Sequence, residues 1–367
     1  MAEYPTMSIL FSPCRVGKLE IDNRFVRSAT HDYMASADGR VTERQVRLYS
    51  ELSRGGVGLI MTGHAFVHPA GKASPRQTAV YDDRFTAGLA SLAAAVHESG
   101  PSRVFLQLAH AGRQTKRSLC GTTPVSASPV HDPVSRVMPR ELEAAEIREL
   151  IQAFVSAAVR ARTAGFDGVQ VHAAHGYLLA SFLSPHTNRR LDEWGGSTEN
   201  RSRFLTEVIS GVKAACGRDF PVAVKLNSTD LLREGGLKAE EAVIIAGLAE
   251  KSGVDAIEVS GGMAEAGRGS VWPGRRLESE EGYFVRNAAL IKHSVGVPVI
   301  GLGGIRTLRV AQEMVERGLV DLVAMSRPFI RDPLLVQHFQ KGLTAASDCI
   351  SCNKCFNPRG IRCARER

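Results

Sequence analysis

Eight short apolar runs, rich in β-branched residues, recur along the chain at intervals that suit a repeating strand and helix unit. Each run is long enough for one buried strand and lacks the three-and-four spacing of a helix. The runs are residues 24–30, 57–63, 103–112, 168–174, 222–228, 256–262, 298–304 and 322–327.

The segments between these runs carry apolar residues at spacings of three and four, which predicts helices. The clearest are residues 145–165 and 308–318, where Gly165 and Gly318 stand at the expected helix C-caps. Eight strands that alternate with helices predict an α/β fold with a parallel closed sheet, a (β/α)₈ TIM barrel in a single domain.

Polar and glycine residues follow almost every run. These residues are Thr30-His31, Gly63-His64, Gln107 to His110, His172 to His175, Lys225 to Asn227, Gly261-Gly262, Gly303-Gly304 and Ser326-Arg327. In a TIM barrel the active site lies at the carboxyl ends of the strands, whereas a doubly wound sheet binds its ligand at one crevice. Their spread over all eight runs therefore favours the barrel. Long insertions at 113–143 and 263–281 are expected to shape substrate access.

The composition is that of an ordinary globular enzyme. Of the 367 residues, 44% are apolar and 23% are charged. The net charge of +8 is scattered and forms no basic stripe, which argues against a nucleic-acid partner. The longest apolar runs fall well short of the roughly 20 residues that span a membrane, and the first residues do not resemble a signal peptide. We therefore expect a cytoplasmic protein.

Four of the seven cysteines crowd into the last 19 residues. An odd number of cysteines without a signal peptide favours a reducing compartment over a disulfide framework. Thiolates at this density suit an iron–sulfur cluster or zinc, and the alternative is a degenerate remnant that binds nothing. The four candidate ligands are Cys349, Cys352, Cys355 and Cys363. We predict a barrel over residues 1–345 and a cysteine-rich tail over 346–367.

The loops after the seventh and eighth runs predict a phosphate site. Barrels commonly bind phosphate there, with backbone N–H groups and a helix N-terminus. Gly303 and Gly304 let the backbone approach a ligand, Thr307 can cap the next helix, and Ser326 and Arg327 can contact phosphate oxygens. The alternative is that the two glycines only form a tight turn.

A second site is predicted after the fourth run, where His172, His175 and Tyr177 fall within six residues. Two imidazole N–H groups can converge on one electronegative substrate atom and polarise it. A tyrosine with a pKa near 10 stays protonated at neutral pH and can donate a proton. A metal at the two histidines would lack a third ligand at a standard spacing, and a structural histidine is the other alternative. No side chain supplies hydride, so a phosphorylated redox cofactor is expected.

The sequence resembles the old yellow enzyme family of FMN-dependent oxidoreductases, which are also called NADH:flavin oxidoreductases. The likeness rests on QLAHAGRQ (107–114), the long motif that runs from Val171 to Phe204, and SRPFIRDP (326–333). It covers about residues 7 to 345.

The resemblance implies FMN at the barrel mouth and NAD(P)H as reductant. It places the phosphate on Gly303, Gly304, Ser326 and Arg327, and Lys225 beside the flavin N1 and C2 oxygen. Gln107 would contact the pyrimidine edge, and the backbone of Ser28, Ala29, Thr30 and Gly63 would line the ring. His172 and His175, with Tyr33, would bind the substrate, and Tyr177 would donate the proton.

One likeness to a particular branch, and three departures from it, bear on the activity. His31 stands where the family often has Thr or Cys, and in this the chain is similar to the 2,4-dienoyl-CoA reductase branch, which also carries a [4Fe–4S] tail. That branch has tail cysteines at wider spacing, a histidine where Ala264 stands here, and a further flavin and nicotinamide domain. A dienoyl-CoA substrate is therefore not expected.

The activity favoured by the sequence is an ene-reductase that reduces a C=C bond next to an electron-withdrawing group on a small molecule. The alternatives are an amine dehydrogenase or demethylase, and a flavin and iron–sulfur electron-transfer subunit. A homo-oligomer is compatible with the sequence.

Overall fold

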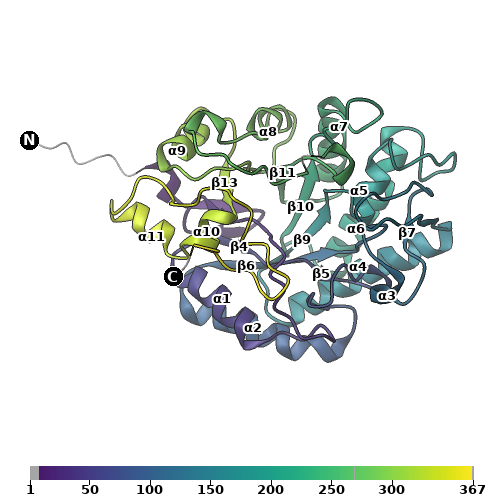
Figure 1. Ribbon diagram of the computed structural model, residues 1–367, viewed down its shortest axis with the longest axis horizontal. Coiled ribbons are helices and arrows are strands. Elements are labelled where there is room, and N and C mark those ends of the chain that lie inside the picture. Colours follow the sequence, from purple (N-terminus) through teal and green to yellow (C-terminus); the bar gives the residue numbers. More distant parts are fainter. Residues whose placement is uncertain (1–7, 268, 366–367) are drawn as a thin grey trace, which may run out of the picture.

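Eight parallel strands close into a barrel in the computed structural model, which describes residues 8–267 and 269–365. β3 pairs with β4 on one side and with β13 on the other, so the sheet closes on itself (Figure 1). In order around the barrel the strands are β3 (Phe25–Arg27), β4 (Leu59–Met61), β6 (Arg103–Ala109), β9 (Gly168–Ala173), β10 (Val222–Asn227), β11 (Ala256–Ser260), β12 (Val299–Gly301) and β13 (Leu322–Met325). Each predicted run contains one of these strands, which confirms the TIM barrel.

Helices follow the strands and cover the outside of the barrel, as Figure 1 shows. They are α1 (Glu43–Arg54), α2 (Thr86–Ser99), α4 (Ala144–Thr163), α6 (Thr198–Cys216), α7 (Ala239–Lys251), α8 (Val285–Lys292), α9 (Leu308–Glu316), α10 (Arg327–Arg331) and α11 (Leu335–Gln340). Gly165 and Gly318, just beyond α4 and α9, have φ of 84° and 65°. A left-handed residue at this position is the usual end of a helix, so both predicted C-caps are confirmed.

An N-terminal hairpin, β1 (Cys14–Val16) with β2 (Leu19–Ile21), packs against one end of the barrel. Val16 and Ile21 join the apolar cluster inside the barrel, together with Leu59 and Phe105. Arg103, the first residue of β6, donates to the carbonyl of Glu20 at 3.3 Å, so this is the end where the strands begin. The hairpin leaves the opposite end, where the strands finish, available for a site.

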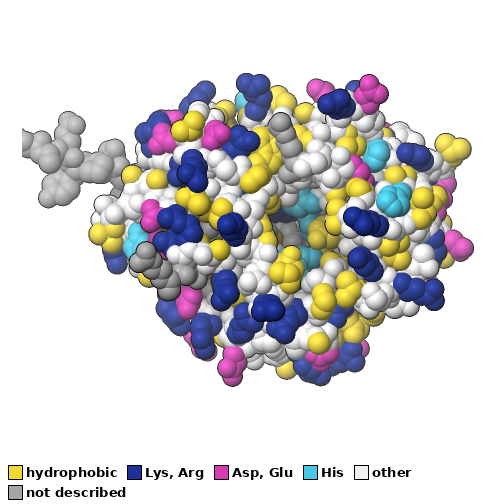
Figure 2. Space-filling model, viewed as in Figure 1, with side chains coloured by type: hydrophobic (Ala, Val, Ile, Leu, Met, Phe, Trp, Pro, Cys, Tyr) yellow, Lys and Arg dark blue, Asp and Glu magenta, His cyan; other side chains and the backbone are white. Residues whose placement is uncertain are grey.

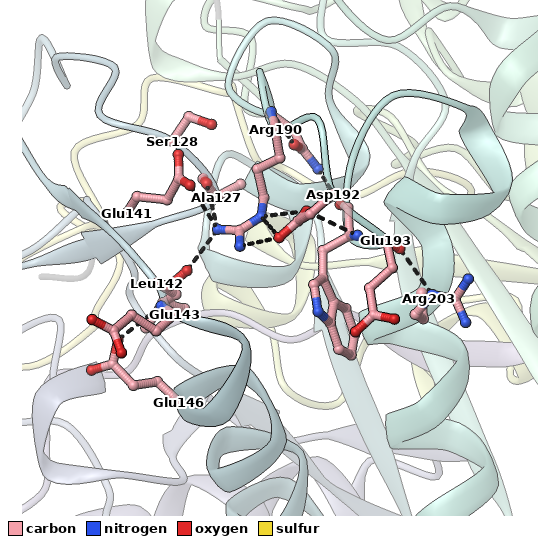
Figure 3. A network of polar contacts seen from close by, with 12 residues as sticks. Ala127, Ser128, Glu141, Leu142, Glu143, Glu146, Arg190, Asp192, Glu193 and Arg203 are labelled. Carbon is pink, nitrogen blue, oxygen red and sulfur yellow. Dashed lines mark hydrogen bonds and ion pairs between the residues drawn. The ribbon is translucent and has the colours of Figure 1, made fainter.

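The insertion over residues 113–143 contains a short helix and two short strands. These are α3 (Arg117–Cys120), β7 (Val125–Ser126) and β8 (Arg140–Glu141). Hydrogen bonds from Arg190 connect this insertion to the segment after α5 (Leu178–Leu183), as Figure 3 shows. Its guanidinium donates to the carbonyls of Ala127 at 3.2 Å and Leu142 at 2.6 Å, and Asp192 holds it from the other side. This part of the long family motif therefore has a structural role.

The remaining elements are short and lie in the loops. They are β5 (Ala65–Phe66) and the 3₁₀ turns η1 (Ile9–Phe11), η2 (Pro69–Gly71), η3 (Asp83–Phe85), η4 (Ala264–Ala266) and η5 (Glu278–Glu280). In the part of the chain that the structure describes, each helix is too short or too polar to cross a lipid bilayer.

The cysteine-rich tail lies against the barrel, beside α1 and α10. Arg44 on α1 donates to the carbonyl of Arg359 at 3.0 Å, and Ile361 N–H donates to the carbonyl of Asp32 at 2.8 Å. In Figure 1 the tail is the yellow loop that runs from α11 past α10 toward α1. It thereby reaches the loops at the carboxyl ends of the strands.

Candidate functional site

A cavity of about 490 Å³ opens at the carboxyl ends of the barrel strands. Its volume lies in the range of about 300–1,000 Å³ that is usual for small-molecule sites. Figure 2 shows a hollow with histidine side chains inside it and Lys and Arg side chains around it. Thirteen of the fourteen expected cofactor and substrate residues line the cavity: Ser28, Ala29, Thr30, Tyr33, Gln107, His172, His175, Tyr177, Lys225, Gly303, Gly304, Ser326 and Arg327.

Gly63 is the expected residue that is not among those lining the cavity. Its N–H donates to the Tyr49 hydroxyl at 2.7 Å, and that hydroxyl donates to Asp32 at 2.9 Å. A Cβ at this position would lie 3.0 Å from the carbonyl oxygen of Thr30. The absence of a side chain at Gly63 thus lets the loop after β3 pack closely on the loop after β4, with Gly63 directly against the backbone of Thr30.

His172, His175 and Tyr177 form one cluster, as their spacing predicted. The ring centres of His172 and His175 lie 5.2 Å apart, and those of His172 and Tyr177 lie 4.9 Å apart. His172 is the penultimate residue of β9 and lines the cavity at the barrel mouth, beside Lys225 on β10. His172 Nδ1 is buried and has no partner among the described residues. An unsatisfied buried polar atom of this kind is a common mark of a functional site.

His175 is held in a strained backbone conformation. Its φ of 62° lies in the left-handed region, which costs a non-glycine residue of the order of 1 kcal/mol. Three hydrogen bonds hold it there. Its N–H donates to Asn227 Oδ1 at 3.1 Å, its carbonyl accepts from Gln114 Nε2 at 2.8 Å, and its Nε2 lies 2.8 Å from Ser260 Oγ. Strain supported by its surroundings in this way is typical of functional positions.

Burial makes the histidines neutral and keeps the tyrosine protonated. Loss of solvation lowers the pKa of His175 to about 3 and that of His172 well below its usual range. A neutral imidazole has one donor and one acceptor nitrogen. Burial, with a smaller effect of Tyr33, raises the pKa of Tyr177 well above 10. At neutral pH the cluster therefore contains neutral imidazoles and a phenol that carries its proton.

A chain of buried polar residues crosses the barrel beneath the cavity. Gln107 Nε2 donates to Gln170 Oε1, and Gln170 Nε2 donates to Glu258 Oε2, both at 2.7 Å. The other oxygen of Glu258 accepts from Ser28 Oγ at 2.5 Å and lies 3.2 Å from Lys225 Nζ. Gln107 and Lys225, two expected cofactor ligands, are therefore connected through one buried carboxylate.

The expected phosphate end of the cavity is built from two glycines and an arginine. Gly303 has φ of 130°, and a Cβ there would lie 2.7 Å from Tyr283 N. Gly304 has φ of 75°, and a Cβ there would lie 2.9 Å from Tyr283 Cε1 and 3.9 Å from Arg327 Nη2. Side chains are thus excluded where backbone and guanidinium face the cavity together. The prediction that the Thr307 side chain caps α9 is wrong. Thr307 stands at the N-cap position, but its hydroxyl donates to Glu281 Oε1 at 2.7 Å instead.

The cysteine-rich tail contributes to the same cavity wall. Cys349, Ser351, Asn353 and Phe356 line the cavity, and Arg327 Nη1 donates to Asn353 Oδ1 at 2.7 Å. All four tail cysteines also surround a small neighbouring cavity of about 20 Å³. Burial raises the pKa of Cys355 to about 11.

Metal ligation is not preformed in the described residues, which contain no group of three or more Cys, His, Asp or Glu side chains arranged to hold an ion. That finding includes His172 and His175. The four cysteines line one cavity, but no three of them are arranged to hold an ion.

Sequence reasoning placed two further lining residues, His31 and His64, at strand ends but gave neither of them a role in catalysis or binding. His31 and His64 follow β3 and β4, and their place at strand ends was the available signal. Their ring centres lie 4.6 Å apart, and His64 lies 5.4 Å from the ring of Tyr177. The cavity thus contains four histidines rather than the two that the family motif suggested.

Comparison with known proteins gives one consistent picture. The model of the NADH:flavin oxidoreductase / NADH oxidase family matches residues 9–346. An NADH oxidase of Thermoanaerobacter brockii is 41% identical over 96% of this chain and 54% of its own length. An NADPH dehydrogenase of Geobacillus sp. (strain WCH70) is 37% identical over 89% of this chain and 92% of its own.

Among solved structures, 2-naphthoyl-CoA reductase in complex with 2-naphthoyl-CoA superposes with a TM-score of 0.89 at 31% identity. The match covers 95% of this chain and 54% of that one. The chain spans about half the length of the first curated relatives that it matches.

Proposed function

Because the chain belongs to the NADH:flavin oxidoreductase / NADH oxidase family, we propose that it uses FMN and NAD(P)H to reduce a carbon–carbon double bond activated by an electron-withdrawing group. The observation that carries this proposal is the cluster of His172, His175 and Tyr177 inside the cavity at the barrel mouth. The NADPH dehydrogenase and the 2-naphthoyl-CoA reductase among its relatives support a reductase.

The residues present fit FMN. Gly303 and Gly304 line the cavity beside Arg327, with φ of 130° and 75° that side-chain-bearing residues rarely adopt. Backbone N–H groups and an arginine are the donors that a phosphate group requires. At the opposite side, Lys225 and Gln107 present a cation and an amide to the cavity. We propose that these residues, with Ser28, Ala29, Thr30 and Ser326, hold the cofactor, which supplies hydride transfer when bound.

The two histidines bind the substrate's activating oxygen in this proposal. Since each ring is neutral, each can donate one hydrogen bond without bringing a positive charge into the cavity. The donated hydrogen bonds withdraw electrons from the conjugated double bond and stabilise the negative charge that develops on the oxygen. The centre of the His172 ring lies 4.9 Å from that of the Tyr177 ring.

Tyr177 donates a proton to the carbon that does not receive hydride. Its hydroxyl keeps the proton at neutral pH because burial raises its pKa, and a solvent proton restores it after turnover. The balance is one hydride from NAD(P)H and one proton, added across one double bond, with NAD(P)⁺ as the other product. General acid catalysis by a positioned group commonly contributes about 10²–10⁴-fold to a rate.

The test is anaerobic turnover by the full chain supplied with FMN. NADH or NADPH oxidation that requires 2-cyclohexenone, with cyclohexanone formed in equal amount, supports the proposal. Oxidation of sarcosine or dimethylglycine by the same preparation, without enone reduction, would replace it with the amine dehydrogenase alternative. A relative named N,N-dimethylglycine/sarcosine dehydrogenase, 34% identical to this chain, makes that comparison necessary.

A second candidate function is electron transfer through an iron–sulfur cluster on the tail. The observation in its favour is that Cys349, Cys352, Cys355 and Cys363 surround one small cavity next to Arg327. Four thiolates are the usual ligands of such a cluster. In this proposal the four thiolates would hold the cluster, which would supply one-electron transfer to or from a partner.

A further inference from the structure

A second pair of histidines, His31 and His64, lines the same cavity as the family pair. His64 lies 6.4 Å from His172 and 5.4 Å from Tyr177, measured between ring centres. The ring centre of Tyr177, the proposed proton donor, thus lies 5.4 Å from that of His64 and 4.9 Å from that of His172. Nothing in the family motif assigns a role to His64.

The loop after η2 holds both of these histidines. Ser74 Oγ lies 2.5 Å from His31 Nε2. Gln77 Nε2 lies 2.9 Å from His64 Nδ1 and donates to the His64 carbonyl at 3.2 Å. The Gln77 side chain is fully buried, so its contacts with His64 are made without competition from water.

The contacts of Gln77 fix which nitrogen of His64 carries the proton. Ala73 N–H donates at 2.6 Å to the amide oxygen of Gln77. A backbone N–H can only donate, so the amide oxygen faces Ala73 and the amide nitrogen faces His64. An amide nitrogen also only donates, so His64 Nδ1 must accept. Burial keeps the ring neutral by lowering its pKa, and the single ring proton is therefore on Nε2.

We propose that His64 Nε2–H is a hydrogen-bond donor to the substrate and that Gln77 is the positioning residue that fixes it in this role. The cavity then offers donors at two separate places, His172 with His175 at one and His64 at the other. This arrangement suits an activated alkene with an acceptor oxygen at each end of the double bond, such as an enedione. This inference rests on the proposed function, because it concerns the substrate of the same site.

The second acceptor has a chemical consequence. The carbonyl bound by His172 and His175 lies next to the carbon that receives the proton from Tyr177. The carbonyl bound by His64 lies next to the carbon that receives hydride, and a donated hydrogen bond there makes that carbon more electron-poor. His64 therefore favours doubly activated alkenes over simple enones.

The test compares two substrates and one isosteric variant. The substrates are a gem-dimethyl cyclohexenedione and the matching gem-dimethyl cyclohexenone, which differ only in the second carbonyl. In Gln77→Glu a carboxylate replaces the amide. When ionised, this carboxylate still accepts from Ala73 but can only accept from His64, so in a ring that stays neutral the proton moves to Nδ1 and Nε2 becomes an acceptor. We expect the dione-to-enone ratio of kcat/KM to fall by about 5- to 100-fold, the scale of losing one buried hydrogen bond.

A matched control and a second variant keep the result interpretable. Gln312→Glu makes the same chemical change at an exposed position on α9 and should leave the ratio as in the wild type. His64→Phe keeps a ring of similar size but removes the donor, and it should lower the ratio as Gln77→Glu does. Unchanged ratios in both cavity variants would overturn the inference.

The tautomer of His64 has a readout that does not depend on activity. Long-range ¹H–¹⁵N correlation spectra of protein labelled at histidine distinguish a proton on Nε2 from one on Nδ1. We expect Nε2–H in the wild type and Nδ1–H in Gln77→Glu, and Nδ1–H in the wild type would refute the assignment. If the wild type reduces neither alkene, the proposed function fails and the substrate assignment fails with it, whereas an unchanged ratio in an active enzyme refutes only the role of His64.

Discussion

Lys225 Nζ lies 3.2 Å from Glu258 Oε1 inside the barrel, with 4% of the lysine side chain and none of the glutamate side chain exposed. The lysine thus reaches the cavity as half of an ion pair and not as a free cation. Glu258 also accepts hydrogen bonds from the side chains of Ser28 and Gln170. Its charge therefore orients these two side chains as well as Lys225. Removing one partner of a buried pair leaves an uncompensated charge.

The first prediction follows from this pair. Glu258→Gln removes the negative charge while it keeps the shape, so Lys225 stabilises an anionic reduced flavin more strongly. The midpoint potential of bound FMN should become more positive, by about 30 mV for each tenfold change in the two-electron equilibrium constant. Spectroscopic titration against a redox dye of known potential measures it.

A control lies at the other end of the same strand. Asp255, just before β11, pairs with Lys213 at 2.5 Å and is remote from the cavity. Asp255→Asn should leave the flavin potential at the wild-type value. An unchanged or more negative potential in Glu258→Gln would mean that the pair does not act on the cofactor.

The second prediction separates Tyr177 from the histidines. Tyr177→Phe should slow the reoxidation of reduced flavin by an enone by about 10²–10⁴-fold, because it removes the proposed general acid. Reduction of the flavin by NAD(P)H needs no proton from Tyr177 and should remain fast. Stopped-flow absorbance follows each half-reaction separately.

Phenol binding provides the contrast. A phenol that stacks on the oxidised flavin gives a long-wavelength band, and its oxygen is expected on His172 and His175. His172→Ala should weaken phenol binding by about 1–3 kcal/mol, whereas Tyr177→Phe should change it little. Wild-type reoxidation by the enone in Tyr177→Phe would assign the proton to another donor, such as Tyr33 or water.

The third prediction concerns stability and pH. Burial lowers the pKa of His110 from 6.5 to about 3. Between those values the unfolded chain binds the proton and the folded chain does not, so the free energy of unfolding falls as the pH falls. The slope is at most about 1.4 kcal/mol per pH unit for this group. His110→Asn should flatten the fall between about pH 6 and about pH 4, as measured by urea unfolding.

The design of this variant preserves one contact. His110 Nδ1 accepts from Gly112 N–H at 3.0 Å, and the asparagine oxygen can accept the same bond. Parallel pH curves for the variant and the wild type would show that His110 is not buried as a neutral ring.

The fourth prediction tests the tail. Anaerobically prepared protein should contain iron and acid-labile sulfide, and Cys352→Ser should remove both. Because Asn353 bonds to Arg327 and Cys349 lines the cavity, FMN should also dissociate more readily from this variant. Cys120→Ser, in the 113–143 insertion, is the control. If the purified protein contains neither iron nor zinc, the tail is a degenerate remnant that binds no metal.

The barrel could be predicted from the sequence because each strand is a local signal. Eight apolar runs and two C-capping glycines fix the order of elements, and the closed parallel sheet follows. His172, His175 and Tyr177 were also recognisable, since they fall within six residues and so needed no tertiary information to be placed together.

The residues that the sequence did not reveal act through distant partners. Glu258 stands inside an apolar run, and only the closed barrel brings it to Ser28, which is 230 positions away. His64 was visible at a strand end, but its role depends on Gln77 in another loop. Thr307 stands at the predicted N-cap, yet Glu281 takes its hydroxyl. These relationships depend on which loops pack together, and a local pattern does not encode that.

The measurement that most directly tests the central claim is single-turnover reduction of an activated alkene by the flavin of the full chain. Protein with bound FMN is reduced with one equivalent of NAD(P)H without oxygen and then mixed with 2-cyclohexenone. We predict that the flavin absorbance returns and that one cyclohexanone forms for each flavin. A flavin that stays reduced with the enone, yet is reoxidised at once by oxygen, would contradict the assignment of this cavity to alkene reduction.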